Sequence, residues 1–247
     1  MYQKKSFPVS DFYKTKNFLC GIINMYSNLK ITEENEMKKQ FFNVPDKVKD
    51  IELWGFSWLE YVTAVPAPLV LVTGYKNNGL ANATMDSWFC FSSENDFYCI
   101  FGSVDKRSHM YEVAKNQKQL VVNFPDKDVL DKCMSTIQNN FYDKDELALA
   151  GLGYHSGSKV NAPVVEECFL NLECEVAWEK PLFEGSNHFI VCTKVVNVWF
   201  DEEHYNSEKL GRYGESGYLY NIRSTLNPET GEREPSRVAV IEPIKTV

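Results

Sequence analysis

The spacing of apolar and polar residues predicts β-strands over much of the chain. The stretch 168–178, CFLNLECEVAW, gives the clearest signal, because from position 170 to 176 apolar side chains alternate with Asn or Glu. Continuous apolar runs bounded by Pro or Gly, such as APLVLVTGY, are typical of buried strands. The predicted strands are 67–75, 96–104, 119–125, 168–178, 188–200 and 237–244.

Fewer stretches have the spacing of helices. In 109–118, Met110, Val113 and Ala114 lie at i, i+3 and i+4, which places them on one buried face. The other predicted helices are 126–139, which opens with acidic residues, and 145–150, which ends before a glycine.

The order of these elements predicts the fold class. The helices are inserted between strands without the strict alternation that builds a parallel sheet. We therefore expect a mainly β protein with inserted helices, arranged as an antiparallel barrel. The composition of 211–235 predicts that this segment is mostly loop, with a turn at 227–231.

The first residues differ from the rest of the chain. Residues 1–36 have no sustained periodicity and run into the charged stretch ITEENEMKK. We expect 1–36 to be an N-terminal arm, poorly ordered, and 37–247 to form the domain. The apolar run FLCGIINMY is short and contains an Asn, so it gives only a weak secretion signal.

Composition and charge exclude several classes of function. The formal net charge is −8, so the chain has no general attraction for phosphate backbones and no nucleic acid partner is expected. The hydrophobic content of 44% is enough for a sizeable core. No apolar run approaches about 18 residues, so no membrane span is expected.

The cysteines and histidines give no sign of a disulfide framework or a metal site. The seven cysteines are odd in number and include no C-x-x-C pair, which indicates reduced core thiols in a cytoplasmic protein. The four histidines lie far apart, so no metal is expected.

The stretch GLANATMDSW, 79–88, is a candidate ligand-binding segment. Its small residues let the backbone approach a flat ligand closely, and Thr84 and Ser87 supply hydroxyl groups. The alternative is an ordinary loop followed by the start of a strand, with Asp86 facing solvent or capping the backbone and Trp88 in the core.

A second candidate segment lies one strand further on. Lys106, Arg107, Ser108 and His109 stand where a predicted helix begins, and cations, a hydroxyl and free backbone N–H groups can bind a phosphate. The alternative is a solvated basic turn in which Ser108 is the helix N-cap. A phosphate site beside a slot for a flat ring fits flavin mononucleotide (FMN).

Four blocks of the sequence together resemble a known family. They are VPAPLVLVTGYKNNGLANATMDSW, KRSH with its helix, VVNFP, and GLGYHSGSKVNAPVVEECFLNLEC. In this order they resemble the flavin reductase-like, FMN-binding split-barrel family, which includes flavoredoxins. The likeness runs from Pro66 to Phe200 and implies an antiparallel split β-barrel.

The resemblance also implies which residues contact the cofactor. Those at the edge of the isoalloxazine ring, largely through backbone groups, would be Asn82, Ala83, Thr84, Met85 and Ser87. Those at the phosphate would be Lys106, Arg107, Ser108 and His109. The chain departs from the family at Met110, where many relatives have Thr, and at Asp86, where they have a small residue.

The function implied is that of an oxidoreductase that passes electrons through non-covalent FMN, with NADH or NADPH as the candidate donor. The flavin carries this chemistry and hydride transfer depends on geometry, so no catalytic side chain is assigned. The resemblance also implies a homodimer with the flavin near its interface. The alternatives are a flavoredoxin-type electron carrier that serves a redox protein without using a nicotinamide, and a non-enzymatic flavin-binding protein.

Overall fold

The computed structural model describes residues 38–53, 56–205 and 217–240. Residues 44–247 group together as one unit, and every element named below belongs to it. The expected arm 1–36 lies outside the described residues, so the division of the chain at residue 37 stays a prediction.

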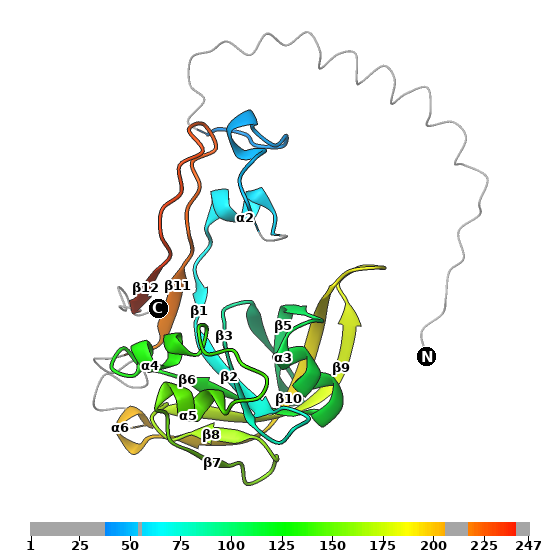
Figure 1. Cartoon of the computed structure of the whole chain (residues 1–247), viewed down its shortest axis with the longest axis vertical. Helices are drawn as coiled ribbons and strands as arrows, with labels where there is room; N and C mark the ends of the chain where they lie inside the picture. Colours follow the sequence, from blue (N-terminus) through cyan, green and yellow to red (C-terminus); the bar gives the residue numbers. More distant parts are fainter. Residues whose placement is uncertain (1–37, 54–55, 206–216, 241–247) are drawn as a thin grey trace, which may run out of the picture. The chain divides into compact units, whose positions relative to one another are not determined.

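The main structural feature is an antiparallel sheet of seven strands in the order β3-β2-β6-β9-β10-β5-β4 (Figure 1). The two edge strands, β3 and β4, follow one another in the chain and are joined only by Ser87 and Trp88. The two edges of the sheet are therefore joined by the chain at one end but share no ladder, as expected for a split barrel. The strands are β2 (Val70–Tyr75), β3 (Ala81–Asp86), β4 (Phe89–Glu94), β5 (Asp96–Asp105), β6 (Gln119–Phe124), β9 (Leu170–Pro181) and β10 (His188–Phe200).

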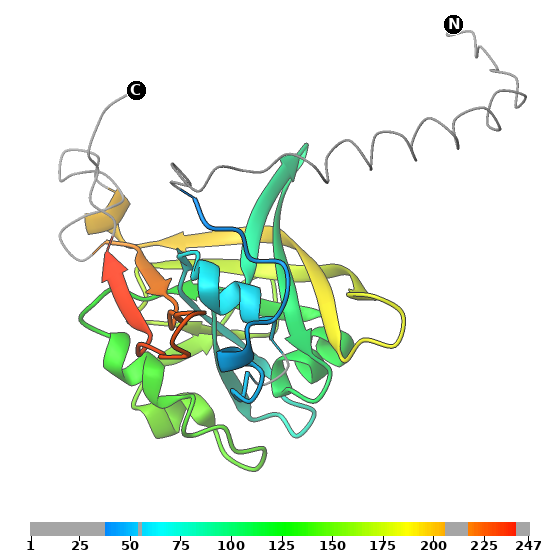
Figure 2. The same ribbon diagram turned by 90° about the horizontal axis from the view of Figure 1, so that it is seen from above.

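Two small sheets and several short helices complete the unit. The small sheets are β1-β11-β12, built from β1 (Ala67–Pro68), β11 (Leu219–Ile222) and β12 (Arg237–Val240), and the pair β7 (Tyr154–Ser156) and β8 (Pro163–Val165). The helices are η2 (Asp46–Val48), α2 (Trp58–Thr63), α3 (His109–Glu112) with its π-helical extension η3 (Val113–Gln117), α4 (Leu130–Ser135), α5 (Glu146–Ala150) and α6 (Glu202–Tyr205). Figure 2 shows the main sheet from above.

The core contains two larger apolar clusters and a smaller third one around Val121, and alternation along β2 divides its side chains between the two larger clusters. Val70 and Val72 of β2 pack into the cluster that α3 and η3 also enter. Leu71, which lies between them in sequence, points the other way and packs with Cys133 of α4 and Leu147 of α5. Both faces of β2 are therefore covered, which explains why its sequence reads as a continuous apolar run.

Most of the predicted strands are confirmed, but five strands were not predicted. The predicted strand 67–75 is divided into β1 and β2, and part of 237–244 lies outside the described residues. The unpredicted strands are β3, β4, β7, β8 and β11. Residues 211–216 of the predicted loop 211–235 lie outside the described residues; the described part, 217–235, is mostly loop as predicted, except where β11 pairs with β1 and β12.

The predicted helices are confirmed to different extents. The helix over 145–150 is confirmed: Asp145 caps its start and Gly151, with φ of 67°, ends it. The helix over 109–118 forms, but its second part is π-helical. The predicted helix over 126–139 is longer than the observed α4. At its start the Asp126 carboxylate accepts hydrogen bonds from the N–H groups of Asp128 and Val129, so the chain forms a turn there instead.

The six cysteines within the described residues are all free. Five are buried, which confirms the prediction that they are core thiols, whereas Cys90 on β4 is exposed and the prediction is wrong there. No helix in the described part of the chain is long and apolar enough to cross a membrane.

Candidate functional site

The candidate segment 79–88 is mainly an edge strand. Side chains at 81, 83 and 85 face the cluster of α4 and α5, so Asn82, Thr84 and Asp86 lie on the opposite face. Interpreting the segment as mostly loop is therefore wrong, and the polar–apolar alternation of NATMD is the strand signal. The accessible backbone is still present, because an edge strand leaves alternate N–H and C=O groups unpaired.

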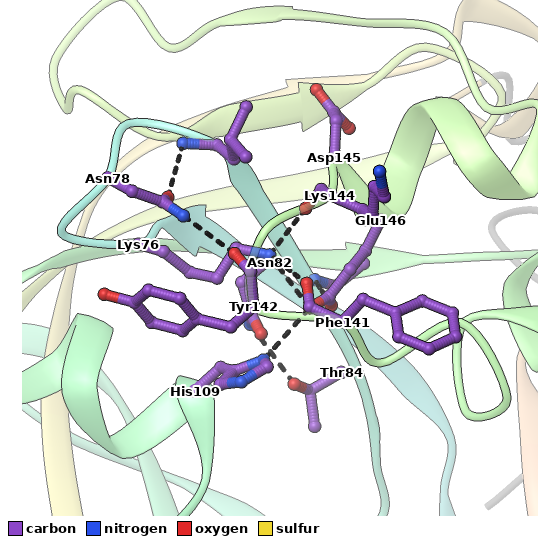
Figure 3. A network of polar contacts seen from close by, with 12 residues as sticks. Lys76, Asn78, Asn82, Thr84, His109, Phe141, Tyr142, Lys144, Asp145 and Glu146 are labelled. Carbon is purple, nitrogen blue, oxygen red and sulfur yellow. Dashed lines mark hydrogen bonds and ion pairs between the residues drawn. The ribbon is translucent and has the colours of Figure 1, made fainter.

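The buried carboxylate of Glu146 joins both candidate segments (Figure 3). One oxygen accepts the N–H of Ala83 at 2.9 Å, on the free edge of β3. The other lies 3.0 Å from Nδ1 of His109, the first residue of α3, and 3.1 Å from Nζ of Lys76. Glu146 therefore holds the start of α3 beside β3.

Lys76 neutralises Glu146 inside the protein. Both side chains are fully buried. The Lys76 ammonium also donates to the carbonyl oxygens of Phe141 and Lys144, at 2.8 and 2.7 Å. Its three donors thus all have acceptors, which a buried ammonium requires. Lys76 and Glu146 were not predicted from the sequence, because they are 70 residues apart along the chain.

Asn82 carries a buried polar atom that has no hydrogen-bond partner among the described residues. Its side chain is buried, and its amide nitrogen donates to Thr84 Oγ1 at 3.2 Å. Its carbonyl oxygen has no partner within the described part of the chain. A buried acceptor of this kind fits a ring N–H of a ligand.

The basic turn 106–108 uses most of its hydrogen-bonding groups within the protein. The backbone N–H groups of Lys106, Arg107 and Ser108 donate to Asn187, to the Asp105 carboxylate and to the Asp105 carbonyl, respectively. Ser108 Oγ caps the helix by accepting the N–H of Tyr111 at 3.1 Å, which confirms the N-cap alternative. The groups of this turn that can still bind a phosphate are therefore its charged side chains.

Of these side chains, Arg107 is held and Lys106 is not. The Arg107 guanidinium is mostly exposed and binds Asp105 at 2.6 and 3.0 Å, and hydrogen bonding to it lowers the pKa of Asp105 to about 2. The exposed Lys106 ammonium makes no ion pair with any described residue. The two cations can therefore take different roles toward an anion.

Asp86 is buried at the end of β3, so the prediction of a solvent-facing residue is wrong. Its carboxylate accepts the N–H of Trp88 at 2.6 Å, which agrees with the capping alternative. Burial raises the pKa of Asp86 to about 6, although the Trp88 N–H and the Arg223 charge oppose the rise. The turn that joins the sheet edges therefore depends on a carboxyl group that ionises near neutral pH.

A cavity of about 720 Å³ opens beside Trp88. The rings of Trp88 and Phe56 lie parallel, with centroids 5.2 Å apart. The cavity, named here the Trp88 cavity, is lined by Phe56, Ser57, Glu60, Trp88, Gly102, Ser103, Arg107, Leu182, Phe183, Gly185, Ser186, Asn187 and His188. It brings together the link after β3, the end of β5, the basic turn and the β9–β10 hairpin.

The predicted site residues fall into three places. Asn82, Ala83, Thr84 and His109 lie around Glu146. Met85 packs into the core cluster of α4 and α5, and Ser87 is buried, with its Oγ bonded to Asn221. The basic turn holds Lys106, Arg107 and Ser108, of which Arg107 lines the Trp88 cavity.

The sequence analysis missed several residues of the cavity. Trp88 was given a core alternative, which is wrong because the side chain is half-buried and lines the cavity. Phe56 and His188 come from segments distant in sequence, so no local spacing marks them. No group of three or more His, Cys, Asp or Glu side chains among the described residues is arranged to hold a metal ion.

Replacing Asp86 by Asn tests the buried carboxyl group. The pKa of Asp86 is higher in the folded protein than in the unfolded chain. The carboxyl group therefore leaves the free energy of unfolding unchanged at a pH below its unfolded pKa, and lowers it as the pH rises through about 6. Asn keeps an acceptor for the Trp88 N–H but does not ionise. The free energy of unfolding of Asp86→Asn, relative to that of the wild type, should therefore increase by about 2 kcal/mol between pH 4 and pH 8. Urea unfolding of both proteins at each pH measures it, and an equal difference at both would contradict the assignment.

Replacing Glu146 by Gln tests the central ion pair. The variant leaves the Lys76 charge buried without a carboxylate, so it should lose about 3–5 kcal/mol of stability. The double variant Lys76→Met, Glu146→Gln removes both charges and should recover a large part of that loss. Urea unfolding gives both values, and a double variant no more stable than the single one would show that the charges are not coupled.

Comparison with known proteins agrees with this architecture. Residues 62–223 match the family model described as "Flavin reductase like domain". Among solved structures, the chain is similar to nitrilotriacetate monooxygenase component B from Bacillus cereus, with 16% identity, a TM-score of 0.65 and coverage of 85% of this chain and 100% of that one. It is also similar to the flavoredoxin of Desulfovibrio vulgaris (Miyazaki F), with 17% identity, a TM-score of 0.58 and coverage of 73% and 90%.

A third similar structure is the NADH:FAD oxidoreductase SgcE6 of Streptomyces globisporus C-1027, with 14% identity, a TM-score of 0.56 and coverage of 83% and 99%. At these identities the structural likenesses concern the fold, and they confirm the predicted split barrel. The family model spans well over half of the chain, so this protein belongs to the family of flavin reductase like domains.

Proposed function

We propose that this protein is an oxidoreductase that holds FMN without a covalent bond in the Trp88 cavity and passes electrons through it. The observation that carries the proposal is the cavity itself. Its volume of about 720 Å³ lies within the usual range of ligand sites, about 300–1,000 Å³. One wall is aromatic and the basic turn lies at its border, which suits a ligand with a flat ring and a phosphate.

The residues present fit FMN at both ends. Phe56 stacks on the Trp88 ring and Arg223 lies over it, so this aromatic pair offers the edges of its rings, rather than a free Trp88 face, to the isoalloxazine. Lys106 and Arg107 supply charge for the phosphate, while the backbone N–H groups of the turn are already used. The other residues first expected to contact the cofactor are not in the lining of the Trp88 cavity, so their roles stay predictions from the resemblance; they are Asn82, Ala83, Thr84, Met85, Ser87, Ser108 and His109.

When bound, FMN accepts and donates the electrons, and the protein orients its substrates and controls its surroundings. His188 is the imidazole that lines the Trp88 cavity, and its Nδ1 lies 2.7 Å from Ser103 Oγ. That contact fixes the ring and leaves Nε2 for a further partner. The proposed electron donor is NADH or NADPH, and a redox protein is the alternative source of electrons.

We expect Lys106→Ala, Arg107→Ala to weaken FMN binding about tenfold or more, because charged hydrogen bonds to the phosphate are lost. Affinity for riboflavin, which has no phosphate, should change little. Quenching of flavin fluorescence measures both. The control, Lys132→Ala, Arg237→Ala, removes two exposed cations that are paired elsewhere. An unchanged FMN affinity in the first variant would reject the phosphate site.

Mixing the FMN-loaded protein with NADH or NADPH without oxygen identifies the donor. Loss of the flavin absorbance within seconds supports a nicotinamide-dependent reductase. A flavin that stays oxidised with both, yet is reduced by dithionite, supports the electron-carrier alternative. Protein that takes up no flavin would contradict both.

We also propose that the protein is a homodimer. Phe91 on edge strand β4 and Phe97 on β5 are 41% and 40% exposed, and their rings stack with centroids 5.1 Å apart. Exposed paired aromatic rings on a sheet edge are typical of an interface. Sedimentation equilibrium should give a dimer for the wild type and a monomer for Phe91→Asp, Phe97→Asp. Leu149→Asp, an exposed position on α5, is the control and should remain dimeric.

A further inference from the structure

The loop at the tip of the β9–β10 hairpin, residues 182–187, forms one side of the Trp88 cavity. Its residues in the lining are Leu182, Phe183, Gly185, Ser186 and Asn187. Two of them are large apolar residues that solvent reaches, because Leu182 is 50% exposed and Phe183 is 65% exposed. A single exposed apolar side chain is common on a protein surface, but two at the border of a cavity are candidate contacts for a ligand.

Hydrogen bonds of the backbone hold Phe183 at the start of a turn. The Ser186 N–H donates to the Phe183 carbonyl oxygen at 3.0 Å. Gly185, inside this turn, has a φ of 82°, a conformation that glycine adopts without strain. The Leu182 N–H donates to the His188 carbonyl oxygen at 2.9 Å and joins the two strands below the turn. Phe183 therefore belongs to a hydrogen-bonded turn with a defined backbone.

The same loop is joined to the basic turn. The Asn187 carbonyl oxygen accepts the N–H of Lys106 at 2.8 Å. His188, the next residue, pairs with Asp105 across strands β10 and β5. Phe183 and the cations proposed for the phosphate thus lie on segments that the backbone holds together. A ligand that is bound by its phosphate at the basic turn has its flat ring in the cavity that Phe183 borders.

The other aromatic rings of the lining already pack against groups of the protein. Trp88 has Phe56 stacked on it, with centroids 5.2 Å apart, and the Arg223 guanidinium 3.8 Å from its centroid. Phe56 also has the His188 ring at right angles to it, at 5.9 Å. The Phe183 ring makes no ring or cation contact with any residue that the structure describes. Phe183 therefore has free ring surface for a ligand, whereas Trp88 and Phe56 offer mainly edges.

We propose that the Phe183 side chain packs against the isoalloxazine ring and determines how tightly the flavin is held. This inference rests on the proposed function, since FMN in the Trp88 cavity supplies the flat ring. Covering Phe183 with that ring removes apolar surface from water, and two flat rings also gain from offset stacking. The contact involves the ring system alone, so it stabilises bound riboflavin, which has no phosphate, as much as bound FMN.

The test uses two variants of Phe183 and one control. Phe183→Ala removes the ring, and Phe183→Tyr keeps a flat ring of nearly the same size. Because Phe183 is exposed, its removal leaves no gap in the core, so the variant should fold. Tyr205→Ala is the control, because Tyr205 is also aromatic and 65% exposed but is not in the lining.

Quenching of flavin fluorescence gives the Kd of FMN and of riboflavin for each protein. Phe183→Ala should raise both Kd values about tenfold or more, because the ring contact is lost. Phe183→Tyr and Tyr205→Ala should bind both flavins as the wild type does. Equal affinities of Phe183→Ala and the wild type for both flavins would overturn the proposal. A loss of affinity for FMN but not for riboflavin would also overturn it, because the lost contact would then involve the phosphate.

The same measurements separate this inference from the proposed function. A wild type that binds FMN as tightly as Phe183→Ala does would overturn the inference and leave the function intact. A wild type that binds neither flavin would overturn both. Sedimentation equilibrium should give Phe183→Ala the same oligomeric state as the wild type. A monomeric variant of a dimeric wild type would show that a second copy of the chain covers Phe183, and would overturn the inference.

Discussion

The buried carboxylate of Glu146 is the interaction on which the arrangement of the site depends. A split barrel has no ladder between its edge strands, so other contacts must fix the elements that follow each edge. Glu146 connects the end of β2 through Lys76, the free edge of β3 through Ala83, and the start of α3 through His109. Burying a Lys–Glu pair has a large desolvation cost, and the two carbonyl oxygens that also bind Lys76 offset part of it.

The short link between β3 and β4 places the aromatic wall of the cavity. Only Ser87 and Trp88 separate the two strands, and Asp86 fixes their turn by accepting the Trp88 N–H. Arg223 binds the Ser87 carbonyl and lies over the Trp88 ring, so β11 and the loop after it support the link from the C-terminal side. Trp88 is thereby half-buried and held in one position between Phe56 and Arg223, so the aromatic wall is rigid before a ligand binds.

Strands with strong local patterns could be predicted from the sequence, whereas elements defined by distant partners could not. The alternation that begins at Leu170 predicted a strand, and β9 forms there, although Trp178 on the apolar face is 40% exposed. Glu173 lies among the polar positions of this alternation, yet the residue is fully buried. Its carboxylate accepts the backbone N–H groups of Lys159 and Val160 and the side-chain N–H of Trp199. Burial raises the pKa of Glu173, but hydrogen bonds from the side chain of Asn197, the backbone of Lys159 and the side chain of Trp199 outweigh burial and lower it to about 2.

The candidate site shows the same limit. The NATMD segment and the KRSH turn were recognisable because their chemistry is local, and the structure joins them through Glu146. The Trp88 cavity was not predictable, because Phe56, Trp88, Gly102 and His188 come from four separate segments. The sequence allowed Ser108 to be either a phosphate ligand or a helix cap. The hydrogen bond from the Tyr111 N–H to Ser108 Oγ, which shows that it is a cap, could not be seen in the sequence.

The central claim is that the Trp88 cavity holds a flavin, and the visible absorption spectrum tests it most directly. The protein is mixed with FMN and passed through a gel-filtration column that removes loosely bound flavin, alongside a Trp88→Ala variant. We expect a yellow wild-type protein with shifted flavin bands and a variant that retains much less flavin. A colourless wild-type protein would contradict flavin binding, and equal retention by the variant would contradict the cavity.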